Sequence, residues 1–184
     1  MKYYICKKYI SMKQILLSLL LLAFSFNTLY AVNDPNDIIK VGDEMPPFSI
    51  VMENGTKINA ADYKGKVILV TLFATWCPPC LKELPQVQKQ IWDVYKDNPD
   101  FQLLVVGREH NEADLKKFNE KRGFTFPLYP DKNRSIFSSF AKNAIPRNYL
   151  IGKDGKVVYT SKGYTPAEFA ELIGMIQTSL QATK

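Results

Sequence analysis

The sequence predicts an α/β fold in which a mixed central β-sheet is flanked by helices. An apolar, β-branched run at residues 67–73 is typical of a buried strand, and a segment with helical periodicity follows it closely. Further strand-like and helix-like segments then alternate along the chain, as they do where helices pack against a sheet. Asn54-Gly55 and Asp154-Gly155 are strong hairpin turn signals, so we expect antiparallel pairing beside each of them.

The individual elements follow from hydrophobic spacing and from capping residues. Apolar side chains recur at helical spacing from Leu81 to Tyr95, and Pro85 is expected to kink this helix because it removes one hydrogen bond. Asn111 is expected to cap the next helix, and Thr165-Pro166 to start the last one. The predicted elements are, in order, a hairpin (49–52 and 56–58), the central strand (67–74), a helix (81–95), a strand (101–107), two helices (112–122 and 135–140), a second hairpin (148–151 and 156–160) and a final helix.

The composition predicts one folded domain with a small appendage. The chain has 184 residues, of which 46% are apolar, enough for a packed core. Its formal charge of +6 is concentrated at the start, where the first 31 residues hold four lysines and no acidic residue. The remainder carries 20 basic and 18 acidic residues, a net of +2, which is an ordinary soluble surface. We therefore expect no nucleic-acid partner.

Residues 1–31 have the layout of a secretory signal peptide. Lysines come first, an apolar stretch follows at 15–26, and a polar stretch ends at Ala31. The apolar stretch is shorter than the roughly 20 residues that span a membrane comfortably. We expect export, with cleavage after Ala31 or at the alternative site in residues 23–25, and membrane attachment only if the signal stays uncleaved.

Behind the signal, residues 32–40 are polar and are expected to form a linker to a domain at 41–184. Met12 would also begin a normal signal, so it is an alternative start. Cys6 precedes the apolar stretch, and we expect it to be absent from the mature protein. Export therefore leaves two cysteines in the folded domain.

Those two cysteines, Cys77 and Cys80, are predicted to form a reactive pair. The order strand, turn, helix puts Cys77 at a helix N-terminus, where free N–H groups and the helix dipole favour a thiolate. Cys80 follows one turn later, and Pro78 and Pro79 suit a first helical turn. A structural disulfide would constrain the unfolded chain little across two intervening residues. From the spacing alone, a structural disulfide, half a zinc site and two unreactive thiols remain as alternatives.

The box Trp76-Cys77-Pro78-Pro79-Cys80, between a buried strand and a helix, resembles the active site of the thioredoxin superfamily. It looks most like the extracytoplasmic TlpA/ResA-type branch, and Gly-Asp-x-x-Pro-x-Phe at 42–48 resembles a segment shared by TlpA-type proteins and peroxiredoxins. The resemblance covers about residues 41–180. It implies a thioredoxin-like fold with an added N-terminal β-hairpin and an insertion around 112–140.

The resemblance also implies an activity and a location. It favours a thiol–disulfide oxidoreductase in the bacterial periplasm or cell envelope, acting as a reductant of protein disulfides and supplied with electrons by a membrane partner. Cys77 would attack the substrate disulfide and Cys80 would resolve the mixed disulfide. The redox group would be the Cys77–Cys80 disulfide itself, with no cofactor and no metal. The direction of electron flow is not fixed by these residues.

Glu83 is the candidate proton acceptor. It lies three positions after Cys80, so the two residues share a helix face, and a carboxylate there can take the Cys80 proton. ResA-like proteins carry a Glu at this position. Thioredoxin instead uses a buried Asp on the central strand, where this chain has Thr71. The alternative for Glu83 is an ordinary surface carboxylate near a helix N-terminus.

Ile145-Pro146 matches the position of the cis-proline that faces the cysteine pair in thioredoxin-like folds. With Trp76, Pro78 and Pro79 it is expected to form the surface on which a substrate docks. Arg147, the next residue, departs from the family pattern and is expected to be exposed, the alternative being an approach to Cys77 or to a substrate carboxylate.

Three other functions are weighed against this one. A thiol peroxidase would need Pro-x-x-x-Thr-x-x-Cys, and no proline stands at that place before Thr75. Structural zinc normally needs four ligands, and the domain offers two cysteines and His110, which we expect in a loop rather than in a ligand role. A non-catalytic binding or metal-handling module is the third alternative, and redox cycling of the cysteines would argue against it.

Overall fold

The computed structural model describes residues 35–182, so the predicted signal peptide and the first residues of the expected linker lie outside the described residues. The strands are β1 (Ser49–Val51), β2 (Lys57–Asn59), β3 (Val67–Phe73), β4 (Phe101–Arg108), β5 (Leu128–Asp131), β6 (Arg147–Ile151) and β7 (Val157–Lys162). The helical segments are η2 (Ala60–Tyr63), α2 (Pro78–Gln86), η3 (Val87–Trp92), α3 (Asp93–Tyr95), α4 (Glu112–Arg122), α5 (Ser135–Phe140) and α6 (Pro166–Gln181).

The central sheet is mixed and has the strand order β5-β4-β3-β6-β7. Strand β3 pairs in parallel with β4 and antiparallel with β6, while β7 pairs antiparallel with β6. A separate hairpin, β1 with β2, precedes it in the chain. The predicted α/β fold and the added N-terminal hairpin are confirmed.

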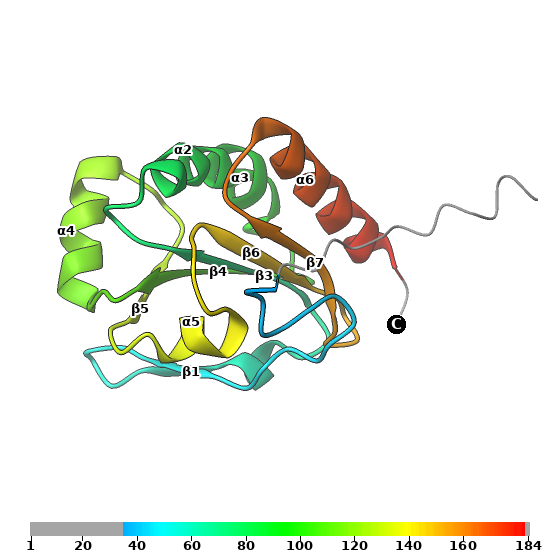
Figure 1. The fold of residues 1–184 in the computed structure, drawn as a ribbon, viewed down its shortest axis with the longest axis horizontal. Helices are drawn as coiled ribbons and strands as arrows, with labels where there is room; N and C mark the ends of the chain where they lie inside the picture. Colours follow the sequence, from blue (N-terminus) through cyan, green and yellow to red (C-terminus); the bar gives the residue numbers. More distant parts are fainter. Residues whose placement is uncertain (1–34, 183–184) are drawn as a thin grey trace, which may run out of the picture. The chain divides into compact units, whose positions relative to one another are not determined.

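The two faces of the sheet are covered by different elements, because successive side chains of a strand point to opposite faces. Every residue of β3 is buried. Val67, Leu69 and Phe73 join the core formed with α2 and α6, whereas the alternate residues join the core formed with α5 and β1. Figure 1 shows α2, α3 and α6 on one side of the sheet and α5 and β1 on the other.

The helix predicted at 81–95 is divided into three segments that begin at Pro78. Pro85 has no N–H to donate, and the N–H of Val87 is shared between the carbonyl oxygens of Glu83 and Leu84. A π-helical stretch, η3, follows at once. The kink expected from Pro85 therefore takes the form of a change in helix type, a common response to a lost helical hydrogen bond.

Strand β5 was not among the predicted elements. It contains Pro130, and a proline inside an apolar run argues against a central strand. The structure places β5 at the edge of the sheet, where a missing N–H is tolerated. The predicted capping of α4 is confirmed, since the side chain of Asn111 accepts the N–H of Asp114 at 2.8 Å.

Residues 35–40, the described part of the segment that we expected to be a linker, lie against the domain. Asp37 forms a β-bridge with Ala141, and the N–H of Ile38 donates to the carbonyl oxygen of Phe140 at 2.9 Å. Across residues 35–182, no helix combines the length and the apolar character needed to cross a bilayer.

Candidate active site

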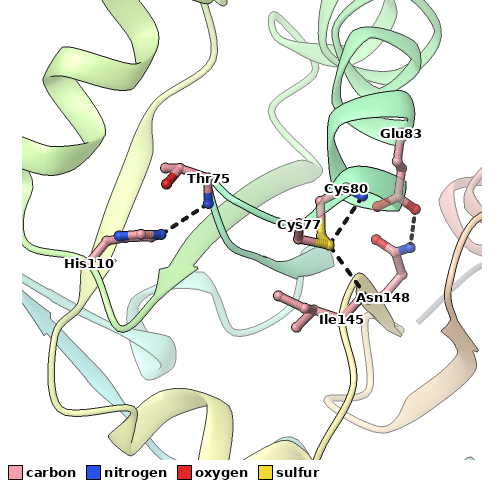
Figure 2. Close-up of a disulfide and its surroundings, with 7 residues drawn as sticks. All are labelled: Thr75, Cys77, Cys80, Glu83, His110, Ile145 and Asn148. Carbon is pink, nitrogen blue, oxygen red and sulfur yellow. Dashed lines mark hydrogen bonds between the residues drawn. A yellow bond between two sulfur atoms is a disulfide. The ribbon is translucent and has the colours of Figure 1, made fainter.

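Cys77 and Cys80 form a disulfide where the central strand gives way to α2 (Figure 2). Cys77 is the N-cap of α2, and Pro78 and Pro79 occupy its first turn, as the sequence predicts. The backbone N–H of Cys80 donates to the Cys77 sulfur at 3.3 Å. This N–H has no partner within the helix. Together with the helix dipole, it stabilises negative charge on the Cys77 sulfur when the pair is reduced.

The two cysteines differ slightly in exposure. Cys77 is 3% exposed and Cys80 is fully buried, so an incoming group reaches Cys77 first. The carbonyl oxygen of Ile145 lies 3.7 Å from the Cys77 sulfur, and the Ile145–Pro146 peptide bond is cis. The structure thus brings the predicted Ile145-Pro146 segment beside the cysteine pair.

Trp76 forms an exposed rim next to this site, with 59% of its surface open to solvent. The guanidinium of Arg108 lies 5.7 Å from the centre of the Trp76 ring and 4.8 Å from that of Phe137. Such cation–π contacts favour one orientation of the indole. A flat apolar side chain is therefore held at the edge of the cysteine site.

His110 supports the turn that leads into the cysteines. Its Nε2 accepts the backbone N–H of Thr75 at 3.0 Å, so the imidazole is unprotonated at that nitrogen. Burial lowers the His110 pKa, an effect that Asp114 and Glu109 oppose. The residue lies in a loop as predicted, but its role in bracing Thr75 had no signal in the sequence.

Glu83 is only 1% exposed, so the alternative of a surface carboxylate is wrong. Its Oε1 accepts a hydrogen bond from the side-chain amide of Asn148 at 2.7 Å, and its Oε2 has no partner among the described residues. Burial raises the Glu83 pKa to about 7, although the Asn148 hydrogen bond lowers it in part. The carboxyl group shares its helix with Cys80, one turn away (Figure 2).

Asn148 is a site residue that sequence reasoning missed. Its Oδ1 accepts the Thr71 hydroxyl at 2.8 Å, and its amide nitrogen donates to Ser161 at 3.2 Å as well as to Glu83. Thr71 thus fixes which end of the amide faces Glu83. Only the strand pairing points to Asn148, because it places this residue directly opposite Thr71 in the β3–β6 register.

Arg147 is buried, at 1% exposure, and the expectation of an exposed arginine is wrong. Its guanidinium forms an ion pair with the buried carboxylate of Asp37, and its Nε donates to the carbonyl oxygen of Asn143 at 2.8 Å. The hydroxyl of Tyr149 also donates to Asp37, at 2.6 Å. Burial, followed by the nearby Asp37, raises the Tyr149 pKa. An arginine is seldom buried without such partners, and the decisive one lies 110 residues away in sequence.

Within residues 35–182, His, Cys, Asp and Glu side chains do not gather in any group of three or more that suits a metal ion. The redox group that the structure displays is the protein's own disulfide.

Comparison with known proteins identifies the group to which this site belongs. The Redoxin family profile matches residues 40–176. The chain belongs to the Redoxin family. Thiol-disulfide oxidoreductase ResA of Bacillus anthracis is 32% identical over 120 residues, which cover 65% of this chain and 68% of the relative. ResA of Bacillus subtilis is 28% identical over 150 residues, covering 80% and 82%.

Solved structures agree with this assignment. A proposed protein disulfide isomerase from Bacteroides thetaiotaomicron is 34% identical, with a TM-score of 0.76, covering 80% of this chain and 94% of that one. StoA from Bacillus subtilis is 25% identical, with a TM-score of 0.58, covering 71% and 99%. The resemblance to thioredoxin-like proteins of the ResA type is confirmed, and the protein is a thiol–disulfide oxidoreductase of that type.

Proposed function

We propose that this oxidoreductase is exported and reduces disulfides in other proteins. The observation that carries the proposal is the Cys77–Cys80 disulfide at the start of α2, with the buried carboxyl group of Glu83 one turn further along the same helix. The predicted signal peptide at 1–31 and the ResA relatives support an extracytoplasmic location, in the periplasm or cell envelope. The domain expected at 41–184 would then also include residues 35–40, which lie against it.

In the first step, the Cys77 thiolate attacks one sulfur of the substrate disulfide. A mixed disulfide forms between Cys77 and the substrate, and the other substrate sulfur leaves as a thiolate, which takes a proton from water. The N–H of Cys80 and the N-terminal end of α2 favour the thiolate before attack. Cys77 is assigned this step because it is the less buried of the two cysteines.

In the second step, Cys80 attacks the Cys77 sulfur of the mixed disulfide. The Cys80 proton passes to Glu83, and the Cys77–Cys80 bond forms as the bond between Cys77 and the substrate sulfur breaks. That substrate sulfur leaves as a thiolate and takes a proton from water, so the substrate is released as a dithiol. Two electrons have then moved from the enzyme dithiol to the substrate disulfide. A proton acceptor works best when its pKa is near the operating pH, and the Glu83 pKa of about 7 meets that condition.

Substrate docking is assigned to the surface around Cys77. Trp76 and the segment Pro78-Pro79 adjoin Cys77 in the chain, and the carbonyl oxygen of Ile145, which precedes Pro146, lies 3.7 Å from the Cys77 sulfur. The Ile145 carbonyl oxygen, close to Cys77, is a backbone acceptor that an extended substrate segment can use as the attacked sulfur approaches.

The direction of electron flow is tested by the reduction potential of the cysteine pair, measured by equilibration in dithiothreitol or glutathione buffers. A value of about −270 mV, as in thioredoxin, supports a reductant that needs a membrane electron donor. A value of about −120 mV, as in DsbA, would instead make the protein an oxidant and overturn the direction proposed here.

The exchange itself is tested with Cys80→Ser, which is expected to trap substrates as mixed disulfides on Cys77, and with Cys77→Ser as the matched control that traps none. Absence of exchange by the wild-type protein would favour a binding module, and peroxide consumption without a thiol donor would favour a peroxidase.

Export is tested by expressing the full chain in bacteria and sequencing the N-terminus of the extracytoplasmic product.

A further inference from the structure

The first described residues of the chain are joined to the segment that leads into Pro146. The N–H of Ile38 donates to the Phe140 carbonyl at 2.9 Å, and the N–H of Lys142 donates to the Asn36 carbonyl, also at 2.9 Å. The side chain of Asn143 donates to that of Asn36 at 3.0 Å. Residues 36–38 therefore hold the beginning of the loop that ends beside Cys77.

The other end of the loop is held by the same segment through side chains. Arg147, the residue after Pro146, pairs with Asp37, and its Nε also donates back across the loop to the Asn143 carbonyl at 2.8 Å. Tyr149, two residues further along β6, donates to the same carboxylate at 2.6 Å. Both charged groups are buried, with side-chain exposures of 1% for Arg147 and 4% for Asp37.

Between these two anchors, residues 144–146 form a short span that reaches the active site. Ala144 has a φ of +61°, a left-handed conformation that is unfavourable for alanine and persists where the surroundings enforce it. Within this span, the carbonyl oxygen of Ile145 lies 3.7 Å from the Cys77 sulfur. A shift at either anchor would therefore move the atoms that face an incoming substrate.

We infer that Asp37 is a positioning residue for the substrate-docking loop, residues 144–146, and acts on it through Arg147. The inference rests on the proposed docking role of Ile145-Pro146. Asp37 touches neither sulfur, so it is expected to affect how a polypeptide substrate binds and to leave the chemical reactivity of Cys77 unchanged. The segment that we expected to be only a linker is then a part of the docking machinery.

The inference is tested with Asp37→Asn in the reduced enzyme, using insulin as the polypeptide disulfide and dithiobis(nitrobenzoate) as a disulfide without a peptide backbone. The KM for insulin is expected to rise by about fivefold or more, while the rate constant with the small disulfide stays within about twofold. Asp43→Asn is the matched control, because Asp43 is an exposed carboxylate shortly after this segment, and its side chain accepts the local N–H of Lys40. It is expected to change neither value.

A purely structural role is separated by the double variant Asp37→Asn with Arg147→Gln. The single variants leave one buried charge without its partner, whereas the double variant leaves none, so its melting temperature is expected to recover toward that of the wild type. The raised KM is expected to persist, because the shorter glutamine side chain lacks the guanidinium that donates to the Asn143 carbonyl. Recovery of the KM together with stability, or an equal loss of rate with both disulfides, would overturn the inference.

A second measurement does not depend on the proposed activity. Amide hydrogen exchange in the oxidised Asp37→Asn protein is expected to rise in residues 141–147 and to stay unchanged in the other segments. Unchanged exchange in 141–147 would overturn the positioning role. The two proposals can fail separately. If amide exchange rises in residues 141–147 of the Asp37→Asn protein but the wild-type protein reduces neither disulfide, the proposed function is refuted and the loop contact stands.

Discussion

Two neighbouring residues of β6 meet a buried carboxylate on opposite faces of the sheet, and the two carboxylates behave differently. On one face, Arg147 pairs with Asp37. On the other, Asn148 donates to Glu83. Asp37 thus faces a full positive charge that compensates its own, whereas Glu83 faces only a neutral amide, and burial raises its pKa to about 7.

The comparison shows that the partner decides what a buried carboxyl group can do. A carboxylate paired with a guanidinium is held in one place by the ion pair. A carboxyl group that is buried opposite an amide can gain and lose a proton near neutral pH, which is the property required of a proton acceptor. In the roles proposed above, both groups would serve the same site, Asp37 by holding a loop and Glu83 by exchanging a proton.

The largest effect is expected from breaking the charged pair. Arg147→Gln leaves the Asp37 carboxylate buried without its cation, and removal of one partner of a buried ion pair typically costs about 3–5 kcal/mol. The free energy of unfolding of the oxidised protein in urea at pH 7 measures this loss. A loss below about 1 kcal/mol would show that Tyr149 and the backbone compensate the charge without Arg147.

The next effect is the pH dependence that Glu83 contributes to stability. Its pKa rises from an ordinary 4.5 to about 7 on folding, so the folded state favours the protonated form. This contribution is fully present below pH 4.5 and is lost as the pH rises through 7, by roughly 3 kcal/mol in total. The free energy of unfolding of the oxidised protein should therefore fall across this range relative to Glu83→Gln.

The difference between the wild type and Glu83→Gln isolates this residue, because His110 and the other titrating groups are present in both proteins. Glu120→Gln, an exposed site on α4, is the matched control and is expected to run parallel to the wild type. If the stability curve of Glu83→Gln also ran parallel to that of the wild type, the Glu83 carboxyl group would titrate alike in the folded and unfolded chains.

The rate of the Cys80 step is also expected to fall in Glu83→Gln, by an amount comparable in free energy to the stability effect. Glutamine keeps an acceptor for Asn148 but cannot take a proton, and a positioned general base typically contributes about 10²–10⁴-fold. Resolution of the mixed disulfide should therefore slow at pH 7 and lose the rate increase centred on the Glu83 pKa. Stopped-flow measurements of the Cys80 step across roughly pH 5–9 report both, and an unchanged pH profile would remove Glu83 from the mechanism.

The smallest effect is expected from the amide itself. Asn148→Leu removes the donor that partly lowers the Glu83 pKa, so the pKa should rise further and less carboxylate should be present at pH 7. The pH profile of the Cys80 step is expected to shift to higher pH, with a slowing of less than about tenfold at pH 7. Thr71→Val tests the hydroxyl that orients the amide and should shift the profile in the same direction by less.

Features encoded by neighbouring residues were predictable from the sequence, and features made by distant partners were not. The cysteines, their place at a helix start and the position of Glu83 all follow from a few adjacent residues. Glu83 is buried, and the residue that donates a hydrogen bond to it, Asn148, is 65 residues away. Arg147 is a common surface residue type, and only the fold shows that Asp37 lies beside it. Strand β5 escaped prediction because Pro130 is acceptable only at a sheet edge.

The contact between Asp37 and Arg147 also bears on the order in which the chain assembles. Its partners are separated by 110 residues, so it is among the long-range contacts that close a large loop of chain. A chain synthesised or translocated only as far as β5 contains Asp37 but none of the residues that hold it. The docking loop therefore gains its support only after β6 has joined the sheet, late in the emergence of the polypeptide, and a C-terminally truncated chain would leave its own N-terminal segment unanchored.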